Sequence, residues 1–540
     1  MNSPELQPYY PVVVVGAGPV GLTTANLLGI EGVNTLLIEQ HETTVQQPRA
    51  VSIDDEALRT MQAIDLSDEV LADVMPGYGS HYFTAGGSCF AKVEPSTLEY
   101  GYPRRSAFRQ PLLEATLRNG LHRFCNVDVR FLHTLASFDQ DTNGVRLSIE
   151  TPEGAAREIR CGYLVGCDGG QSRVRQHLGI ELGGSTYRQR WLIIDIEGSS
   201  DRFRHTRVFC DPGRPGISLP GPGETRRFEF MLQDGESDTV AEDPGFVNNL
   251  LDRYATDKNP RIVRRQVYTF HARTAARWCD GRVFLAGDAA HLTPPFAGQG
   301  MNSGIRDAHN LAWKLSAVVS GRLPETVLDS YETERKPHAR ALIELAVNMG
   351  RIMMPASPLA AWLIQTGLRA LRIYPPAQRY VTQMKFKPRP YFSVGLICSP
   401  RIAADKRLLG HLFPQPRLEQ PNGDIVLFDH LAGRRFSLLI YAGEIEPFEP
   451  ALEQWRDASI PLQVLWITPA HMMPAPNAPV ECARDIDNAL AALLSRFQDR
   501  ALLLRPDHYV AAVIPRRELV CSGTPERFFA ELQTGVNIGV

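Results

Sequence analysis

The chain has 540 residues, of which 44% are hydrophobic and 22% charged, which excludes the disordered, collagen-like and coiled-coil classes. At about 100 to 200 residues per domain, this length predicts three to four structural units. The charged residues, 57 basic and 60 acidic, give a net charge of −3 without blocks of like charge, which argues against a nucleic-acid or membrane partner.

The first ten residues, MNSPELQPYY, contain neither a basic nor an apolar leader segment, so we expect a cytoplasmic protein. The most apolar later stretch, residues 352–364, contains two prolines and is shorter than the ~20 residues of a spanning helix; we expect a packed helix there. The nine cysteines are scattered without a C-x-x-C pair. They predict reduced, mostly buried thiols, no disulfide framework and no metal site.

The first predicted elements form a βαβ unit. Residues 12–15 are all valine, which indicates a strand buried on both faces of a parallel sheet. A helix is predicted from about residue 20 to 29, and a second strand over 35–38 ends at Glu39. Alternating apolar positions near 127–165 predict further strands, with a hairpin turn at Asn143-Gly144.

Later segments predict a second sheet, a long helix and a separate tail. Residues 186–275 contain strand-like runs broken by Pro and Gly, which indicates a mostly antiparallel sheet. A helix follows, with Gly321 placed to end it, because apolar residues recur at three- and four-residue steps at Ile305, Ala308, Ala312, Leu315 and Val319. Beyond about 400, strand-like runs at 436–441, 462–467 and 501–504 and a helix near 485–497 predict a compact α/β unit.

The motif Gly16-Ala17-Gly18-Pro19-Val20-Gly21 lies between the first strand and the first helix. In a dinucleotide-binding turn the first glycine makes the bend, the second lets the backbone approach a pyrophosphate, and the third lets helix and strand pack closely. Glu39, at the end of the second strand, is placed to accept hydrogen bonds from ribose hydroxyls. The motif therefore predicts dinucleotide binding, but it does not separate NAD from FAD.

Two further motifs separate these cofactors. Cys167-Asp168-Gly169-Gly170 leads into Ser172-Arg173, and a strand at 282–286 runs into Gly287-Asp288, followed by a glycine-rich segment at 298–304. In this order the three motifs resemble the class A flavoprotein aromatic hydroxylases. The resemblance implies an α/β fold: a Rossmann-type FAD-binding domain interleaved with an antiparallel-sheet substrate domain, and a thioredoxin-like C-terminal domain.

The resemblance also implies the cofactor contacts. FAD would be held tightly but non-covalently, with the first motif and Glu39 at its adenosine end, Asp288 at the ribityl chain, and Gly300, Met301 and Asn302 near the flavin ring. Arg49 resembles the arginine that meets the pyrophosphate, and Gln110 resembles a flavin-contacting glutamine. Asp168 and Arg173 are associated in the family with both FAD and the nicotinamide donor. The helix beginning near Asn302 would stabilise reduced, anionic flavin with its N-terminal dipole.

The domain boundaries follow from the same resemblance. The FAD-binding domain is expected over 1–75, 106–185 and 276–400, and the substrate domain over 76–105 and 186–275. The tail, 401–540, resembles the thioredoxin-like domain of these hydroxylases, and it contains only two cysteines, Cys482 and Cys521, without C-x-x-C spacing. A structural or oligomer-contact role is therefore expected rather than redox chemistry.

One subgroup is closer in appearance. Residues 53–62, 226–231, 267–269 and 386–388 resemble 3-(3-hydroxyphenyl)propionate hydroxylases, whereas the loop at 294–297 is more similar to broader phenol and polyketide hydroxylases. The implied reaction uses NADH or NADPH and O2 to hydroxylate a single-ring phenol through a flavin C4a-hydroperoxide. The partners expected are thus a small aromatic substrate and O2, and a homo-oligomer is left open.

The residue that assists phenol deprotonation is left open among Tyr268, His271 and Glu229, with Tyr268 and His271 preferred. His291, after the Gly-Asp turn, is expected to orient that loop. A carboxylated substrate would need an arginine clamp, and nothing ranks the six candidates, Arg188, Arg190, Arg207, Arg214, Arg226 and Arg227. Two alternatives remain: a flavin protein that sequesters an aromatic intermediate without turnover, and an NAD-dependent dehydrogenase, which leaves the second and third motifs unexplained.

Overall fold

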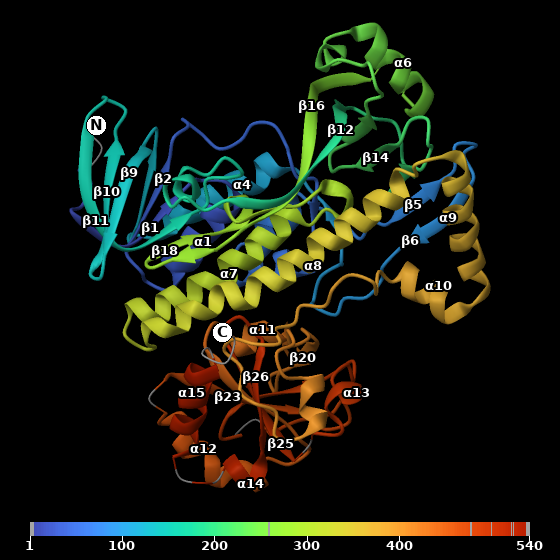
Figure 1. Ribbon diagram of the computed structural model, residues 1–540. Coiled ribbons are helices and arrows are strands. Elements are labelled where there is room, and N and C mark those ends of the chain that lie inside the picture. Colours follow the sequence, from blue (N-terminus) through green and yellow to red (C-terminus); the bar gives the residue numbers. More distant parts are fainter. Residues whose placement is uncertain are drawn as a thin grey trace.

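The computed structural model describes residues 5–257, 260–458, 460–475, 478–497, 499–519, 521 and 523–535. Its three large sheets are arranged around two long neighbouring helices, α7 (Gly300–Val319) and α8 (Ser330–Met353) (Figure 1). The first sheet and most of the second lie above these helices in the view, and the third, built from the C-terminal part of the chain, lies below them.

The first sheet is organised around β1 (Tyr9–Val15), whose valines are buried on both faces. β1 pairs in parallel with β2 (Thr35–Glu39) and β11 (Ala156–Gly166), and α1 (Pro19–Ile30) connects β1 to β2. The predicted βαβ unit is confirmed. The other strands of this sheet are β8 (Val127–Phe131), β9 (Thr134–Asp141), β10 (Gly144–Glu150), β17 (Cys279–Asp280) and β18 (Val283–Leu285).

The hairpin between β9 and β10 forms, but its turn lies one residue earlier than predicted. Asp141 pairs with Gly144 across the hairpin, so Thr142 and Asn143 make the turn. The Asp141 carboxylate accepts hydrogen bonds from the amides of Asn143 and Gly144 at 2.7 and 3.0 Å, which holds the turn in this position.

The second sheet has the order β19-β16-β12-β15-β14-β13-β5-β6. It is antiparallel except where β13 runs parallel to β5. One face packs on α6 (Pro244–Tyr254) through an apolar cluster that includes Ile194 and Phe228. The strands are β5 (Ser80–Phe83), β6 (Cys89–Val93), β12 (Leu182–Glu197), β13 (Thr206–Phe209), β14 (Gly216–Pro220), β15 (Arg226–Met231), β16 (Arg261–Ala275) and β19 (His291–Leu292).

Helix α7 runs through the middle of the molecule and ends where the sequence predicts. Gly321 adopts a φ of +70° just after the last turn, a conformation that glycine takes without steric cost. The smaller elements of this half are β3 (Ser52–Ile53), β4 (Met75–Pro76), β7 (Ser106–Ala107), α2 (Asp55–Ala63), α3 (Ser67–Ala72), α4 (Gln110–Gly120), α5 (Arg173–His177), α9 (Pro358–Ala370) and α10 (Pro375–Thr382).

The C-terminal unit has its own seven-stranded sheet, in the order β21-β20-β24-β23-β22-β25-β26. Trp313 and Ala317 of α7 share an apolar cluster with its residues, so it is packed directly on the first half. Its elements are β20 (Arg417–Glu419), β21 (Ile425–Leu427), α11 (Phe428–Ala432), β22 (Phe436–Tyr441), α12 (Glu449–Arg456), β23 (Leu462–Thr468), β24 (Glu481–Asp485), α13 (Ala491–Leu494), β25 (Arg500–Leu504), β26 (Val510–Pro515), α14 (Arg516–Leu519) and α15 (Thr524–Gly535).

Two predicted helices are wrong in extent. Residues 352–364 are not one packed helix, because α8 ends at Met353, α9 begins at Pro358, and Trp362 is 60% exposed. The helix near 485–497 shrinks to α13, because the Asp485 carboxylate accepts the amides of Ala489 and Leu490 and forms a turn first. Within the described ranges, none of the helices combines the length and apolar character that crossing a bilayer requires.

Candidate functional site

The three glycines of the turn after β1 differ in the space around them. A Cβ added to Gly16, whose φ is +104°, would lie 2.6 Å from the Cys167 carbonyl oxygen, and one on Gly21 would lie 1.9 Å from the Gly16 oxygen. A Cβ on Gly18 would meet nothing within 4 Å. Two glycines therefore serve packing, and the third borders open space at the N-terminus of α1.

Two further glycines bring the first motif against the third. A Cβ on Gly287 would lie 2.7 Å from Val20, and one on Gly304 would lie 2.6 Å from Val20 and 3.0 Å from the Cα of Gly287. The start of α1, the Gly-Asp turn and the first turns of α7 thus meet at one point, from positions far apart in the sequence.

The second motif is joined to the third by Arg175. Its guanidinium is buried and donates to the carbonyl oxygens of Gly170 at 2.9 Å and Ala289 at 3.0 Å. Asp168 accepts the Val174 amide at 3.1 Å with one carboxylate oxygen, while its other oxygen, Oδ1, is buried without a hydrogen-bond partner in the described part of the chain. Burial raises the pKa of Asp168. Arg173 is exposed beside it.

The Gly-Asp turn is held from behind by a buried ionic cluster. Asp307 of α7 accepts the Gly287 amide at 3.1 Å, His291 Nε2 at 2.7 Å and Arg335 Nε at 2.9 Å. Burial would raise the pKa of Asp307, but His291 and Arg335 hold it below its usual value. His291 was expected to orient this loop by a backbone hydrogen bond, but its hydrogen bond is to the Asp307 side chain, and its Nδ1 has no hydrogen-bond partner among the described residues. Asp288, in contrast, is exposed.

Asp288 lies in a recess. Its side chain is open to solvent, yet the surrounding protein desolvates it enough to raise its pKa, against the opposing effect of His291 and Arg49. A carboxylate that is both accessible and enclosed lines a concave surface. Arg49 is exposed nearby, so this recess presents one carboxylate and one guanidinium close together.

Glu39 and Gln110 shape the edges of the site. Glu39 accepts the amide of Ala17 at 2.8 Å, which places a carboxylate against the glycine-rich turn, and each oxygen keeps a lone pair for a further donor. Gln110 is buried, accepts the backbone amides of Arg49 and Ala50 at 2.9 and 2.7 Å, and donates to Glu114. Its side chain therefore supports the Arg49 segment.

The start of α7 offers backbone amides rather than side chains. Asn302 is buried, and its side chain donates to the carbonyl oxygens of Ser52 and Gly298 and accepts the Asp54 amide. Met301 is half-buried. The first amides of a helix, here those of Gly300 to Asn302, have no intrahelical partner, and no side chain caps this end.

These residues fit a flavin dinucleotide. The uncapped amides of α1 and α7 suit a pyrophosphate and an electron-rich ring, the space beside Gly18 admits the phosphates, and Asp168 Oδ1 lacks a partner. Carboxylates at Glu39 and Asp288 suit ribose and ribityl hydroxyls. When bound, FAD supplies the redox and oxygen chemistry, which no side chain of the described residues provides.

The structure does not bring Tyr268 and His271 together. They lie three positions apart on the regular strand β16, so their side chains point to opposite faces. Tyr268 pairs with Trp191 on the face whose rings contact Phe296, and its hydroxyl is bonded to Gln266 and Arg264. His271 shares the other face with Val267 and is bonded to Thr186 at 3.0 Å. The two cannot act on one reacting atom.

Five of the six candidate clamp arginines are already paired with carboxylates. Arg188 has no ion pair or hydrogen bond within the described part of the chain, and it is exposed in the irregular stretch of β12 next to Tyr187, whose ring contacts Phe296. The five pairs are Arg190–Asp238, Arg207–Asp201, Arg214–Glu236, Arg226–Asp201 and Arg227–Asp195. Arg188 is therefore the preferred candidate for the arginine that binds a substrate carboxylate.

Two clusters have metal-ligand residue types, but neither fits a metal. Asp54, Asp55 and Glu56 are neutralised by Arg306 and Lys387. His81, Glu94 and His205 also lie together, with 2.6 Å between His81 Nε2 and Glu94. However, His205 Nδ1 accepts the Gly79 amide at 2.9 Å, which leaves Nε2 of the neutral ring as an N–H donor rather than a ligand.

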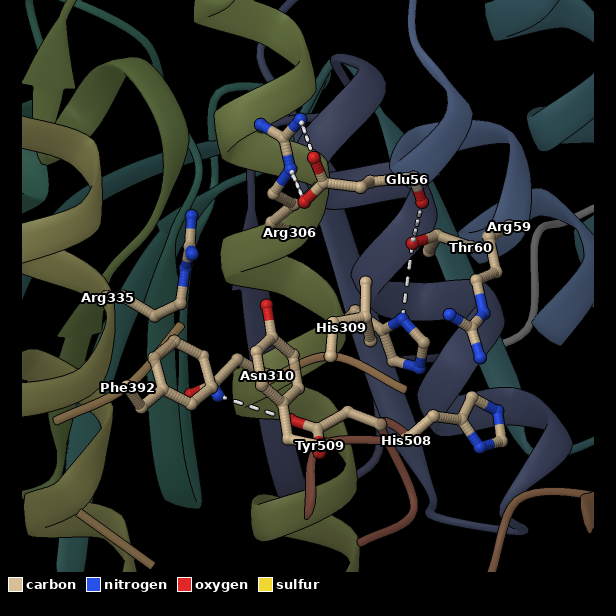
Figure 2. A pocket seen from close by; sticks show the side chains of 12 residues that line it. Glu56, Arg59, Thr60, Arg306, His309, Asn310, Arg335, Phe392, His508 and Tyr509 are labelled. Atoms are coloured by element: carbon tan, nitrogen blue, oxygen red, sulfur yellow. Dashed lines mark hydrogen bonds and ion pairs between the residues drawn. The ribbon is translucent and has the colours of Figure 1, made fainter. Parts of the chain in front are cut away.

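Two cavities lie at the junction with the C-terminal unit, away from the three motifs. The smaller, about 30 Å³, is shown in Figure 2, where Arg306 is paired with Glu56 and Thr60 is bonded to His309, above Tyr509 and His508 in the view. This volume admits a water molecule or two and no organic ligand. The larger, about 640 Å³, is lined mainly by polar groups such as Arg434 and Glu481. The first is too small for an aromatic substrate, and the second lacks the mainly apolar lining that such a ligand requires.

Two residues that build the site carry no motif signal. Asp307 and Arg335 are charged residues at helix positions that face the core, and their partners lie in other segments. The one available sign was a charge interrupting an apolar helix face, as Asp307 does between Ile305 and Ala308.

Comparison with known proteins agrees with this geometry. A family model described as "FAD binding domain" matches residues 9–346, and one described as "HcaD C-terminal domain" matches residues 410–522. The chain is 38% identical to a 3-(3-hydroxy-phenyl)propionate/3-hydroxycinnamic acid hydroxylase of Mycobacterium sp. (strain JLS), covering 93% of this chain and 88% of that protein. It is 37% identical to the Klebsiella pneumoniae (strain 342) protein of the same name, covering 95% and 94%.

A solved structure shares the fold over nearly the whole length. The flavin-dependent monooxygenase PieE, in complex with FAD and substrate, superposes with a TM-score of 0.81 at 24% identity and covers 99% of this chain and 100% of its own. Because the first family model covers more than half of the chain and the relatives match it almost end to end, the chain belongs to the FAD binding domain family, as an FAD-dependent hydroxylase.

Proposed function

We propose that this protein hydroxylates a single-ring phenol with a short acid side chain, of the 3-(3-hydroxyphenyl)propionate type, using NADH or NADPH and O2. The observation that carries the proposal is the meeting of three motifs around one recess. The relatives' names supply the substrate class. Sequestration without turnover is not favoured, because the relatives are hydroxylases.

The proposed cofactor contacts come from this chain's own groups. The pyrophosphate would lie beside Gly16, Gly18 and the first turn of α1. The amides of Val20 and Gly21 would face it, whereas Pro19 in the same turn has no N–H. Glu39 would accept ribose hydroxyls and Asp288 ribityl hydroxyls. Arg49 would approach the pyrophosphate.

The flavin ring would lie against the first turn of α7. The free amides of Gly300, Met301 and Asn302 would donate to it, and Gly287 would keep the neighbouring turn close enough. Gln110 would act through the Arg49 segment that it holds, and Asp168 and Arg173 would border the path of the nicotinamide donor. The task of the protein is to orient the ring, favour the phenolate and exclude water.

Asp288 tests the cofactor assignment. Asp288→Ala removes the one carboxylate in the recess, so we expect protein purified with little flavin and regaining little when FAD is added. The matched control is Asp139→Ala on β9, which removes an exposed carboxylate outside the three motifs. Flavin absorbance per polypeptide is the measurement, and full flavin occupancy in Asp288→Ala would contradict the assignment.

A phenol screen tests the reaction itself. Wild-type holoenzyme should oxidise NADH or NADPH faster when 3-(3-hydroxyphenyl)propionate is added, and mass spectrometry should find a product heavier by one oxygen atom. Ligand binding without any stimulated oxidation would favour the sequestering alternative instead.

The finer architecture also remains our proposal. The predicted domain boundaries are supported by the membership of the second sheet, because β5 and β6 belong to the same sheet as the strands from β12 through β16. A thioredoxin-like tail is supported by the parallel pair β22 and β23 followed by the antiparallel β25 and β26. A redox role is opposed by Cys482, which is buried with its pKa raised by desolvation. We propose a cytoplasmic enzyme.

A further inference from the structure

One carboxylate stands alone in an apolar row of the second sheet. Glu229 of β15 pairs directly with Ile193 of β12 and Ile217 of β14. Residues paired across neighbouring strands share a face, so the row continues through Val208 of β13 to Tyr82 of β5. On its other side the row ends with Gln266 of β16, which pairs with Ile193.

The row lies between two contacts with the cofactor side of the molecule. Two residues before Glu229, Arg227 donates to the carbonyl oxygens of Pro48 and Arg49. Two residues after it, Met231 pairs with Trp191, whose ring centroid lies 5.7 Å from that of Phe296 in the loop before α7. Successive same-face residues on a strand are about 7 Å apart, so Glu229 sits midway between the Arg49 segment and the α7 loop.

Apolar groups cover the part of this face from β14 to β5. Tyr82, Val208 and Ile217 belong to one apolar cluster with Phe296 and with Met353 of α8. Asp195 lies on the same face but is paired with Arg227 and Arg264, so a phenol ring placed beside the apolar cluster would have Glu229 as its unpaired carboxylate acceptor. Such a site has the composition expected for a small aromatic ligand.

The Glu229 carboxylate is not satisfied by the protein. The residue is 8% exposed, and within the described part of the chain its side chain makes no hydrogen bond. Its nearest cation is Arg227 Nη1 at 4.0 Å, but Arg227 donates to Asp195 at 2.7 Å and to the two carbonyl oxygens of the Arg49 segment. The Glu229 side chain is 11% exposed, so a ligand can reach its carboxylate, and a donor on the substrate would supply the hydrogen bond that the described residues do not.

Neither other candidate on β16 is placed as well. The Tyr268 hydroxyl is already bonded to Gln266 and Arg264, and His271 is on the opposite face. Burial raises the pKa of Glu229 to about 7, with Arg227 and Arg264 lowering it and Asp195 raising it. A carboxylate in this range accepts a proton near neutral pH and releases it again.

We propose that Glu229 is the catalytic residue that takes the phenolic proton of the substrate. The inference rests on the proposed function and deepens it. In the step, the phenol O–H bond breaks, a carboxyl O–H bond forms at Glu229, and the electron pair stays on the phenolic oxygen. No group is oxidised or reduced. The phenolate carries more electron density at its ortho and para carbons, where hydroxylation occurs, and Glu229 returns the proton to solvent before the next cycle.

The test uses the holoenzyme and the near-isosteric variant Glu229→Gln. We expect unchanged flavin content and a 10²- to 10⁴-fold lower rate of substrate-stimulated NADH oxidation near neutral pH. The wild-type rate should fall as pH decreases through about 7, and the variant should lose this inflection. Its rate should recover as pH rises toward the pKa of the free phenol, about 10.

A more acidic phenol separates proton transfer from structural damage. Glu229→Gln should turn over a nitro-substituted phenol, which is already ionised, with a rate close to wild type. Glu229→Asp should retain part of the inflection near pH 7 that Glu229→Gln loses. The control is Glu150→Gln on β10, which removes an exposed carboxylate and should keep the wild-type pH profile. A Glu229→Gln enzyme with a wild-type pH profile would overturn the proposal, and so would loss of the inflection in Tyr268→Phe instead.

The ultraviolet difference spectrum of bound phenol keeps this inference distinct from the proposed function. Wild type should show phenolate and Glu229→Gln should show neutral phenol at the same pH, even if no product forms. Failure to hydroxylate any phenol would refute the proposed function alone. Identical spectra of the bound phenol in the two proteins would refute the role of Glu229.

Discussion

At the residue scale, the glycines of the first motif have different physical tasks. Gly21 allows α1 to lie against Gly16, and Gly16 allows the turn to lie against Cys167. Gly18 has a φ of −77°, which any residue adopts, and open space beside it. Its lack of a side chain therefore matters only to a ligand.

This difference predicts two outcomes for the same substitution. Gly18→Ala should leave the thermal midpoint of the flavin-free protein unchanged while it weakens FAD binding. Gly21→Ala should lower the midpoint itself, because its Cβ would lie 1.9 Å from a backbone oxygen. Differential scanning calorimetry and FAD titration are the measurements, with Gly367→Ala on α9, where a Cβ also meets nothing within 4 Å, as the control. Equal FAD affinity in Gly18→Ala and wild type would contradict the assignment.

The residue scale is also where sequence and structure differ most. The motif residues were predictable because a turn against a pyrophosphate restricts residue type at fixed spacing. Gln110 was expected to contact the flavin, yet its side chain is bonded to backbone amides of the Arg49 segment, and the side chain of Asn302 is likewise bonded to the backbone of Ser52. Such contacts depend on how distant segments pack, and local spacing carries no record of them.

At the element scale, α7 is unusual in burying polar side chains along most of its length. Its apolar residues predicted a helix and its boundaries, but Asn302, Arg306, Asp307, Asn310 and Lys314 are buried as well. They connect the helix to several neighbouring segments: Arg306 to Asp54 and Glu56, Asp307 to the Gly-Asp turn, and Lys314 to Glu334. Periodicity identifies a buried face, but it does not identify partners.

The Asp307 cluster predicts a pH-dependent cost. Asp307→Asn leaves Arg335 without its counter-charge, and removing one member of a buried ion pair costs about 3–5 kcal/mol. The folded-state pKa of Asp307 lies below its unfolded value of about 3.9, so its stabilisation is complete above that pH and is lost as pH falls through the folded-state pKa.

Wild type and Asp307→Asn should therefore differ strongly in thermal midpoint at pH 7 and converge in acid. Asp487→Asn, which disrupts a pair with Arg417 whose side chains are 59% and 43% exposed, should change the midpoint much less. Asp307→Asn should also bind FAD more weakly, because an amide offers one acceptor oxygen where the Gly287 amide, His291 and Arg335 share two. A midpoint difference that persists unchanged into acid would contradict an electrostatic origin.

At the scale of the whole molecule, the C-terminal unit is held to α7 and α8 by buried charges. Arg505 is fully buried and donates to both carboxylate oxygens of Glu334, at 2.6 and 2.9 Å, and to Asp507. On the other side of the contact, Arg59 of α2 pairs with Asp429 at 2.6 Å. The sequence indicated a separate unit through its change of composition, but not that charged groups would fix its position.

Two segments that resembled the phenylpropionate subgroup meet in the same region. Lys387 donates to Asp54 at 3.0 Å and to Glu56 at 2.9 Å, so residues 386–388 and 53–62 form one ionic network with Arg306. This network lies behind the start of α7 rather than in the substrate face of the second sheet. We infer that these subgroup features preserve the placement of α7, and that they carry little information about the substrate.

The docking contact predicts that the two halves can be uncoupled. Arg505→Ala would leave Asp507 as a buried carboxylate without an ion-pair partner and Glu334 with Lys314 as its remaining one, and breaking a buried pair costs about 3–5 kcal/mol. Calorimetry should then show a lower-temperature transition of the C-terminal unit, separate from that of the flavin-binding half, and proteolysis should cut the segment joining them sooner. FAD content should stay at the wild-type level, because no motif residue contacts Arg505.

The control is Arg417→Ala, whose pair with Asp487 is on the surface, with side chains 59% and 43% exposed. A single transition at the wild-type temperature in Arg505→Ala would show that apolar contacts such as Trp313 with Phe436, and not the buried charges, hold the unit in place.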